Sequence, residues 1–106
     1  MGDIAGARHA IFIGPIAPSR DELEERLVRE GLEPRWWDND ANDRYDWHAH
    51  EYAKVLFCAS GSVVFHMRDG DVSLNPGDRL DIEAGTEHAA TVGAAGVTCV
   101  EAMDDF

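Results

Sequence analysis

Cysteine is scarce in this chain, whose 106 residues include only Cys58 and Cys99. The two lack the C-x-x-C spacing of metal and redox motifs, and two cysteines cannot build the dense disulfide framework of small secreted domains. We therefore expect two reduced, buried thiols in a cytoplasmic protein. A single disulfide between them is the alternative.

Basic residues are also few, with nine lysines and arginines against twenty-one acidic residues and a formal net charge of -12. A surface of this charge repels phosphate backbones and anionic lipid headgroups. Neither nucleic acid nor a membrane is therefore expected as a partner. The chain has one lysine, Lys54.

Long apolar runs are missing as well. The short apolar stretch from Ala10 to Ile13 is broken by Gly14 and Pro15, so it is too short for a signal segment or a membrane span. Hydrophobic residues make up 44% of the chain and charged residues 28%, a composition able to bury a modest core. A chain of 106 residues provides for one compact domain, so we expect residues 1–106 to form a single one.

One helix is predicted, from about Arg20 to Glu30. Ser19 followed three residues later by Glu22 makes a capping box, and Gly31 supplies a stop. The expected buried stripe of this helix consists of Leu23, Leu27 and Val28.

The rest of the chain predicts strands. After Trp36 and Trp37, the polar stretch from Asp38 to Asp46 is expected to be a loop, and its spacing does not match a calcium-binding loop. Asp69-Gly70 is typical of a two-residue hairpin turn, and residues 75–78 are expected to form the next turn. The expected strands are 54–58, 62–68, 71–74, 79–82, 88–92 and 97–102. Short strands at such intervals indicate a sandwich or barrel.

Three histidines form a candidate metal site. Alternate residues of a strand share a face, so His48 and His50 are expected to point the same way, and His88 can join them from a second segment. Neutral imidazole is the usual ligand for borderline divalent metals. His9 lies in an N-terminal stretch expected to be untethered, and His66 lies in a hairpin strand without a second ligand at suitable spacing.

These histidines belong to two stretches that resemble the motifs of the cupin superfamily. In the first motif, G-x5-H-x-H-x3 or x4-E-x6-G, His48 and His50 match the histidines and Gly61 the closing glycine. In the second, G-x5-P-x-G-x2-H-x3-N, the matching residues are Gly77, Gly85 and His88. The resemblance covers residues 46–102. It implies an all-β fold, the cupin double-stranded β-helix or jelly-roll barrel, here with a short N-terminal helix.

The chain departs from these motifs at four positions. Asn42, Glu83 and Val92 replace a glycine, a proline and an asparagine, changes that concern turns and loops. Lys54 stands in place of the glutamate that is normally the fourth protein ligand in the family. A protonated lysine has no lone pair and repels a divalent cation, so the resemblance implies a three-histidine site.

Three-histidine cupin sites are similar to those of thiol dioxygenases and diketone-cleaving dioxygenases, which hold iron(II). The resemblance therefore favours iron(II), with manganese, nickel, zinc or copper as alternatives. Lys54 is a candidate catalytic residue that orients or polarises substrate; alternatively it faces outward or pairs with Asp81 or Glu83. Tyr52 and Cys58, which share the alternation of Lys54, are further candidate pocket residues.

Two functions are compatible with these observations. The first is a metalloenzyme, dioxygenase-like or isomerase-like, that acts on a small anionic molecule. The second is a non-catalytic cupin module that binds or senses a small molecule. Small cupins resemble one another in pairing through sheet edges and N-terminal segments, so a homodimer is expected.

Overall fold

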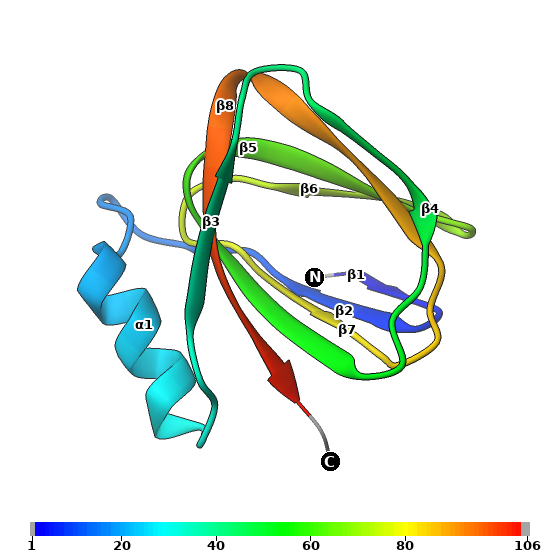
Figure 1. The fold of residues 1–106 in the computed structure, drawn as a ribbon. Helices are drawn as coiled ribbons and strands as arrows, with labels where there is room; N and C mark the ends of the chain where they lie inside the picture. Colours follow the sequence, from blue (N-terminus) through cyan, green and yellow to red (C-terminus); the bar gives the residue numbers. More distant parts are fainter. Residues whose placement is uncertain (1, 105–106) are drawn as a thin grey trace.

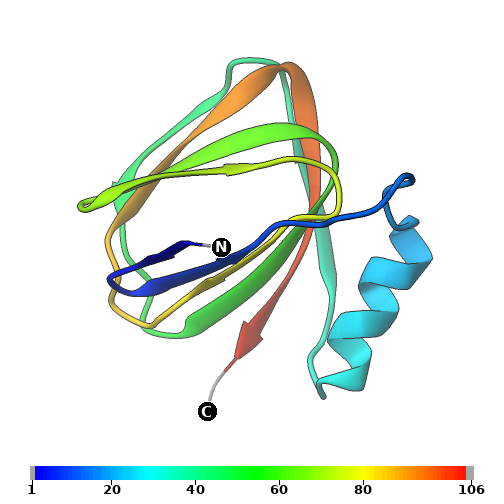
Figure 2. The same cartoon turned by 180° about the vertical axis from the view of Figure 1, so that it is seen from behind.

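The computed structural model of the protein describes residues 2–104, and its strands close into a barrel with one helix outside it (Figures 1 and 2). In chain order the elements are β1 (Gly2–Ile4), β2 (Ala7–Ala10), α1 (Arg20–Arg29), β3 (Arg35–Asn39), β4 (Arg44–His48), β5 (Ala53–Met67), β6 (Gly70–Leu74), β7 (Arg79–Ile82) and β8 (His88–Asp104).

The barrel is built on two long antiparallel strands, β5 and β8, which pair with each other from Ala53↔Asp104 to Met67↔His88. The first part of β5 also pairs with β7, and its last part with β6. The last part of β8 pairs with β3, and its first part with β4. Each of the two long strands therefore pairs with different neighbours along its two halves, and the predicted all-β jelly-roll barrel is confirmed.

Each long strand was expected as two separate strands. Instead, β5 bends at Gly61, where the backbone has a φ of 71°, and its register with β8 shifts on both sides of this residue. The facing segment of β8 contains Gly96, with a φ of 78°. Because glycine adopts positive φ without strain, the two strands bend here while their pairing continues. The glycine-containing segments that resemble turns in the sequence therefore mark bends within β5 and β8, and the strands continue beyond them.

Apolar side chains from both long strands fill the barrel. The inward residues are even-numbered at the start of β5, as Leu56 and Cys58 show, and odd-numbered after Gly61, as Val63 and Phe65 show. In β8 they change from even to odd in the same way: Ala90 and Val92 face inward before the bend, and Val97 and Cys99 after it. The bulges therefore exchange the inner and outer faces of each strand along its length.

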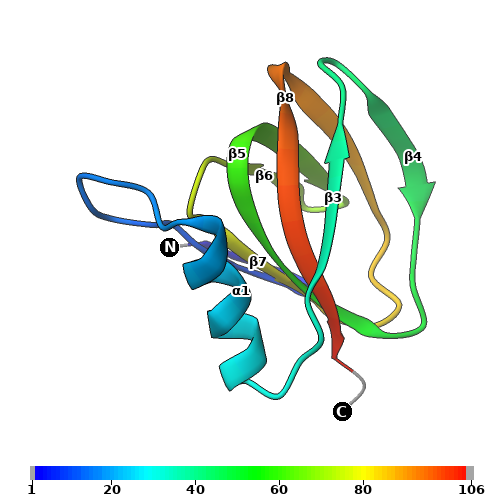
Figure 3. The ribbon, with the colours of Figure 1, turned by 60° about the vertical axis from the view of Figure 1, so that its left-hand side comes forward.

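Helix α1 lies against the outside of β5 and β8 (Figure 3). The predicted capping box is present, since the Ser19 hydroxyl accepts from the backbone of Glu22 and the Glu22 carboxylate accepts from that of Ser19. Leu23 and Leu27 are fully buried, but Val28 is 56% exposed, so its expected burial is wrong. In the described part of the chain, no helix reaches the length and apolarity that crossing a membrane requires.

Two segments expected to be irregular form strands. Most of the polar stretch 38–46 belongs to β3 and β4, and only residues 40–43 connect them. Pairing with β8 determines this outcome, because edge strands leave one side in water and accept polar residues. The N-terminal stretch was also expected to be untethered, yet His9 lies in β2, opposite Leu80 of β7.

Smaller differences concern turns. The two-residue loop of the β5–β6 hairpin consists of Arg68 and Asp69, one residue earlier than expected, because Met67 pairs with Gly70. Asn42, in the position of the first motif's leading glycine, has a φ of 66°. Asparagine is among the few side chains that tolerate this conformation, so the substitution keeps the turn.

Candidate metal centre

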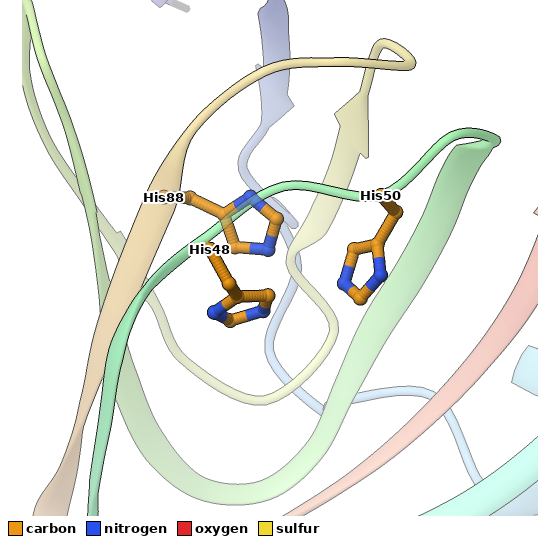
Figure 4. Close-up of side chains that lie close together, drawn as sticks. All are labelled: His48, His50 and His88. Carbon is orange, nitrogen blue, oxygen red and sulfur yellow. The ribbon is translucent and has the colours of Figure 1, made fainter.

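The three candidate histidines come together at one end of the barrel, with their rings around a common space (Figure 4). His48 is the last residue of β4 and pairs with His88, the first residue of β8. His50 lies beyond the end of β4, and its carbonyl oxygen accepts a 2.7 Å hydrogen bond from the Gly85 amide. The alternation argument assumed one continuous strand through both histidines, whereas this loop contact holds His50 in place.

One ring nitrogen from each histidine lies within 4.8 Å of those of the other two. The ring centroids are 4.3 Å apart for His48 and His88, 4.9 Å for His48 and His50, and 5.3 Å for His50 and His88. His88 is 1% exposed, His50 is partly buried and His48 is exposed. Metal centres with three histidines and open positions use this donor set.

Hydrogen bonds to backbone carbonyls engage one ring nitrogen of His48 and one of His88, and this leaves the other ring nitrogen available. Nδ1 of His48 lies 2.7 Å from the carbonyl oxygen of Asp46, and Nδ1 of His88 lies 2.9 Å from that of Thr86. A carbonyl only accepts, so in the neutral form of each ring Nδ1 carries the proton and Nε2 has the lone pair. Nε2 of His50 is buried without a hydrogen-bond partner among the described residues. A buried, unpaired ring nitrogen is unfavourable unless a ligand satisfies it, and the set fits a divalent metal.

The surroundings of His50 and His88 favour the neutral form of both rings. Burial, followed by the charges of Lys54 and His48, lowers the pKa of His50. Burial also lowers the pKa of His88, an effect that its hydrogen bond to Thr86 opposes. Since a protonated imidazole cannot coordinate a metal, both shifts extend the metal-binding form to lower pH.

These shifts predict how the metal-free protein responds to acid. The unfolded chain takes up protons on its histidines near a pKa of about 6.5, whereas the folded protein resists protonation of His50 and His88 until lower pH. Stability is therefore expected to fall as the pH drops below about 6.5 toward the lowered folded-state values. Thermal unfolding of the metal-free protein across this range, compared with His50→Gln, measures the effect. A decline equally steep in the variant would contradict the account.

A pocket of about 360 Å³ opens beside the histidines, a size suited to a small molecule. Lys54 lies in this pocket, and most of the remaining wall is aromatic or apolar. The lining residues are Trp37, Tyr45, His48, His50, Lys54, Phe65, His88, Ala90 and Glu101.

Tyr52 and Cys58, the further candidate pocket residues, are not among the residues that line this pocket. The Tyr52 ring stacks on that of His50, with centroids 5.0 Å apart, so it supports a candidate ligand. Cys58 faces the barrel interior but is fully buried among core side chains, opposite Cys99 on β8. Both cysteines are free thiols. The hydrogen bond with Cys58, together with burial, raises the pKa of Cys99, which therefore stays un-ionised.

Lys54 pairs with an acid that sequence reasoning missed. Its Nζ lies 3.2 Å from Oε1 of Glu101, and the same oxygen accepts a 2.7 Å hydrogen bond from Nε1 of Trp37. The alternative interpretation of the sequence paired Lys54 with Asp81 or Glu83; Asp81 instead pairs with Arg79. Alternation counted from His88 places residue 101 on the outside of β8, and only the change of face near Gly96 brings it inward.

The sequence model of the AraC-like ligand-binding domain family matches residues 38–98, which include all three histidines and Lys54 and make up more than half of the chain. The chain belongs to the AraC-like ligand-binding domain family. Comparison of this AraC-like domain with functionally curated proteins finds no match.

Solved structures similar to this AraC-like domain include proteins described as cupins, proteins of unknown function and enzymes. A DUF861 family protein from Thermotoga maritima has a TM-score of 0.65 at 14% identity, over 92% of this chain and 99% of that one. A cupin-2 domain protein from Shewanella frigidimarina has a TM-score of 0.59 at 17% identity, over 71% of each chain. Oxalate decarboxylase from Bacillus subtilis has a TM-score of 0.63 at 18% identity, over 70% of this chain and 21% of that one. At these identities the likeness establishes the cupin fold.

Proposed function

We propose that this protein is a metal-dependent cupin that acts on a small anionic molecule. In this proposal His48, His50 and His88 hold one divalent transition metal, which supplies open positions for ligand or oxygen. Iron(II) is favoured, and manganese, nickel, zinc and copper also accept imidazole ligands. The observation that carries the proposal is the convergence of three ring nitrogens within 4.8 Å.

Lys54 has a binding role in this proposal. It lines the same pocket as the three histidines, and its side chain is 14% exposed. The contact with Glu101 leaves ammonium hydrogens free to donate to a bound ligand. We infer that Lys54 orients the ligand relative to the metal. An oxalate decarboxylase among the structural neighbours supports chemistry on small acids in this fold.

A second function, a ligand-binding or sensory module without turnover, is favoured by the family match to a ligand-binding domain. The two functions predict different fates for the ligand. Metal-loaded protein should be incubated with small carboxylates, thiols and diketones while oxygen uptake and the recovered compounds are measured. Conversion that disappears in His48→Ala supports the enzyme. Saturable binding with unchanged compound supports the module. If the metal is bound but no compound is converted or bound, both proposed functions are contradicted.

We also propose that the protein is a cytoplasmic homodimer. The free thiols are compatible with a reducing compartment. Residues 10–19 carry no charge, and their Ile11, Ile13 and Ile16 are 55%, 91% and 80% exposed. Exposed apolar groups of this kind are typical of association surfaces. Light scattering measures the mass in solution, and a monomer at all concentrations tested would contradict the dimer.

A further inference from the structure

The ion pair between Lys54 and Glu101 gives the pocket a second polar element besides the histidines. The two side chains are 14% and 20% exposed, so water screens the pair only partly. Trp37 on β3, Lys54 on β5 and Glu101 on β8 come from three strands that are neighbours in the sheet. The indole and the ammonium both contact Oε1, which fixes the carboxylate inside the pocket.

The charges of these groups limit which ligands the pocket accepts. Three neutral imidazoles leave the two positive charges of a divalent metal uncompensated, so one end of a ligand should be anionic. Elsewhere in the pocket lining, the positive charge of Lys54 is already balanced by Glu101 at 3.2 Å. A second anionic group placed there would face the Glu101 carboxylate as well as the ammonium.

The pair also offers hydrogen bonds that the protein leaves unused. One contact occupies Nζ of Lys54, which has three donors, and in the described residues both contacts to Glu101 use Oε1. Donors and an acceptor are thus presented side by side. A neutral group that both accepts and donates, such as an amide or hydroxyl, satisfies both without adding charge.

We propose that the Lys54–Glu101 pair selects monoanionic ligands with a neutral hydrogen-bonding far end and discriminates against dianions. The inference rests on the proposed metal centre and specifies the substrate class of that site. The anionic group of the ligand binds at the metal, and the amide or hydroxyl end meets Lys54 and Glu101. Glu101 acts here as a specificity residue, a role that no sequence motif assigns to it.

A matched set of four-carbon acids tests this selection. Succinamate carries one carboxylate and an amide, succinate carries two carboxylates, and butyrate carries one carboxylate and a methyl group. Calorimetry should measure their binding to protein loaded with Zn²⁺, which is redox-inert, at a pH where all carboxylates are ionised. We expect succinamate to bind tighter than succinate or butyrate by about tenfold.

Two variants at the pair should change this preference in opposite directions. Glu101→Gln removes the negative charge and frees the ammonium, so the affinity of succinate relative to succinamate should rise by about tenfold or more. Lys54→Met leaves the negative charge of Glu101 uncompensated, so the affinity of succinate relative to succinamate should fall further. Either variant tests the proposal if the other does not fold.

Glu24→Gln is the matched control. Glu24 also accepts a hydrogen bond from an indole, that of Trp36 at 2.8 Å, but lies on α1, away from the pocket. Like Glu101→Gln, the control removes one negative charge beside an indole donor while keeping an acceptor oxygen, and it should leave the succinate-to-succinamate ratio unchanged. If zinc and the acids bind but Glu101→Gln leaves this ratio as it is in the unmodified protein, the inference is wrong and the metal centre stands. If zinc does not bind, both the proposed metal centre and the selectivity inferred from it are wrong.

Discussion

Replacing His48 by alanine is expected to abolish stable metal binding while leaving the fold intact. His48 is exposed and ends an edge strand, so its loss leaves no cavity in the core. In the proposed centre it is one of three histidine ligands, and its Nδ1 is engaged by the Asp46 carbonyl, which leaves Nε2 for the metal. Loss of a group that merely supports a ligand costs about 10–100-fold in metal affinity, so loss of the ligand itself should cost more than about a hundredfold.

His66→Ala serves as the control for this variant. His66 is a histidine on β5 that faces outward, 2.9 Å from both Asp71 and Thr91, and it takes no part in the cluster. Metal affinity should be measured for both variants by competition with a chelator of known affinity, and circular dichroism should show that both fold. Equal metal affinity in the two variants would contradict the three-histidine centre.

Replacing Gly61 by alanine is expected to destabilise the protein by more than about 4 kcal/mol, a large part of the stability of a typical small domain. Gly61 stands at the bend of β5 with a φ of 71°. A Cβ atom there would lie 2.0 Å from the carbonyl oxygen of Gly96, and backbone cannot swing away as a long side chain can. The strain of positive φ adds about 1–2 kcal/mol to this clash.

Gly31→Ala separates these two contributions. Gly31 follows α1 with a similar φ of 81°, but a Cβ atom added there meets nothing within 4 Å. Its substitution should therefore cost only the conformational strain of about 1–2 kcal/mol. Urea unfolding of both variants gives the comparison. A similar loss of stability in both would show that the close approach of β5 and β8 is not what requires glycine at position 61.

Local signals in the sequence predicted a large part of this structure. The capping box predicted the start of α1 at Arg20, where the helix begins, because a helix start depends on neighbours within one turn. Motif glycines at 61, 77 and 85 all have positive φ, which explains why the motif spacing survives in the backbone. The three histidines were predicted together from two motifs and converge in the structure.

Other features depend on contacts that local signals do not contain. The bulges near Gly61 and Gly96 change which residues face inward, so simple alternation could not place Phe65 or Glu101 in the pocket. The strands β3 and β4 have polar sequences and form because β8 offers them a partner. The negative partner of Lys54 comes from a strand forty-seven positions later, and this pairing follows only from the three-dimensional register.

The central claim is that the three histidines hold one divalent transition metal. The most direct measurement is the metal content per chain of protein purified without an affinity tag, by elemental analysis before and after metal is supplied. The account predicts about one transition-metal ion per chain, removable by chelation and restored by adding iron(II) or another of the candidate metals. Protein that retains none, and takes up none of iron, manganese, nickel, copper or zinc, would contradict it.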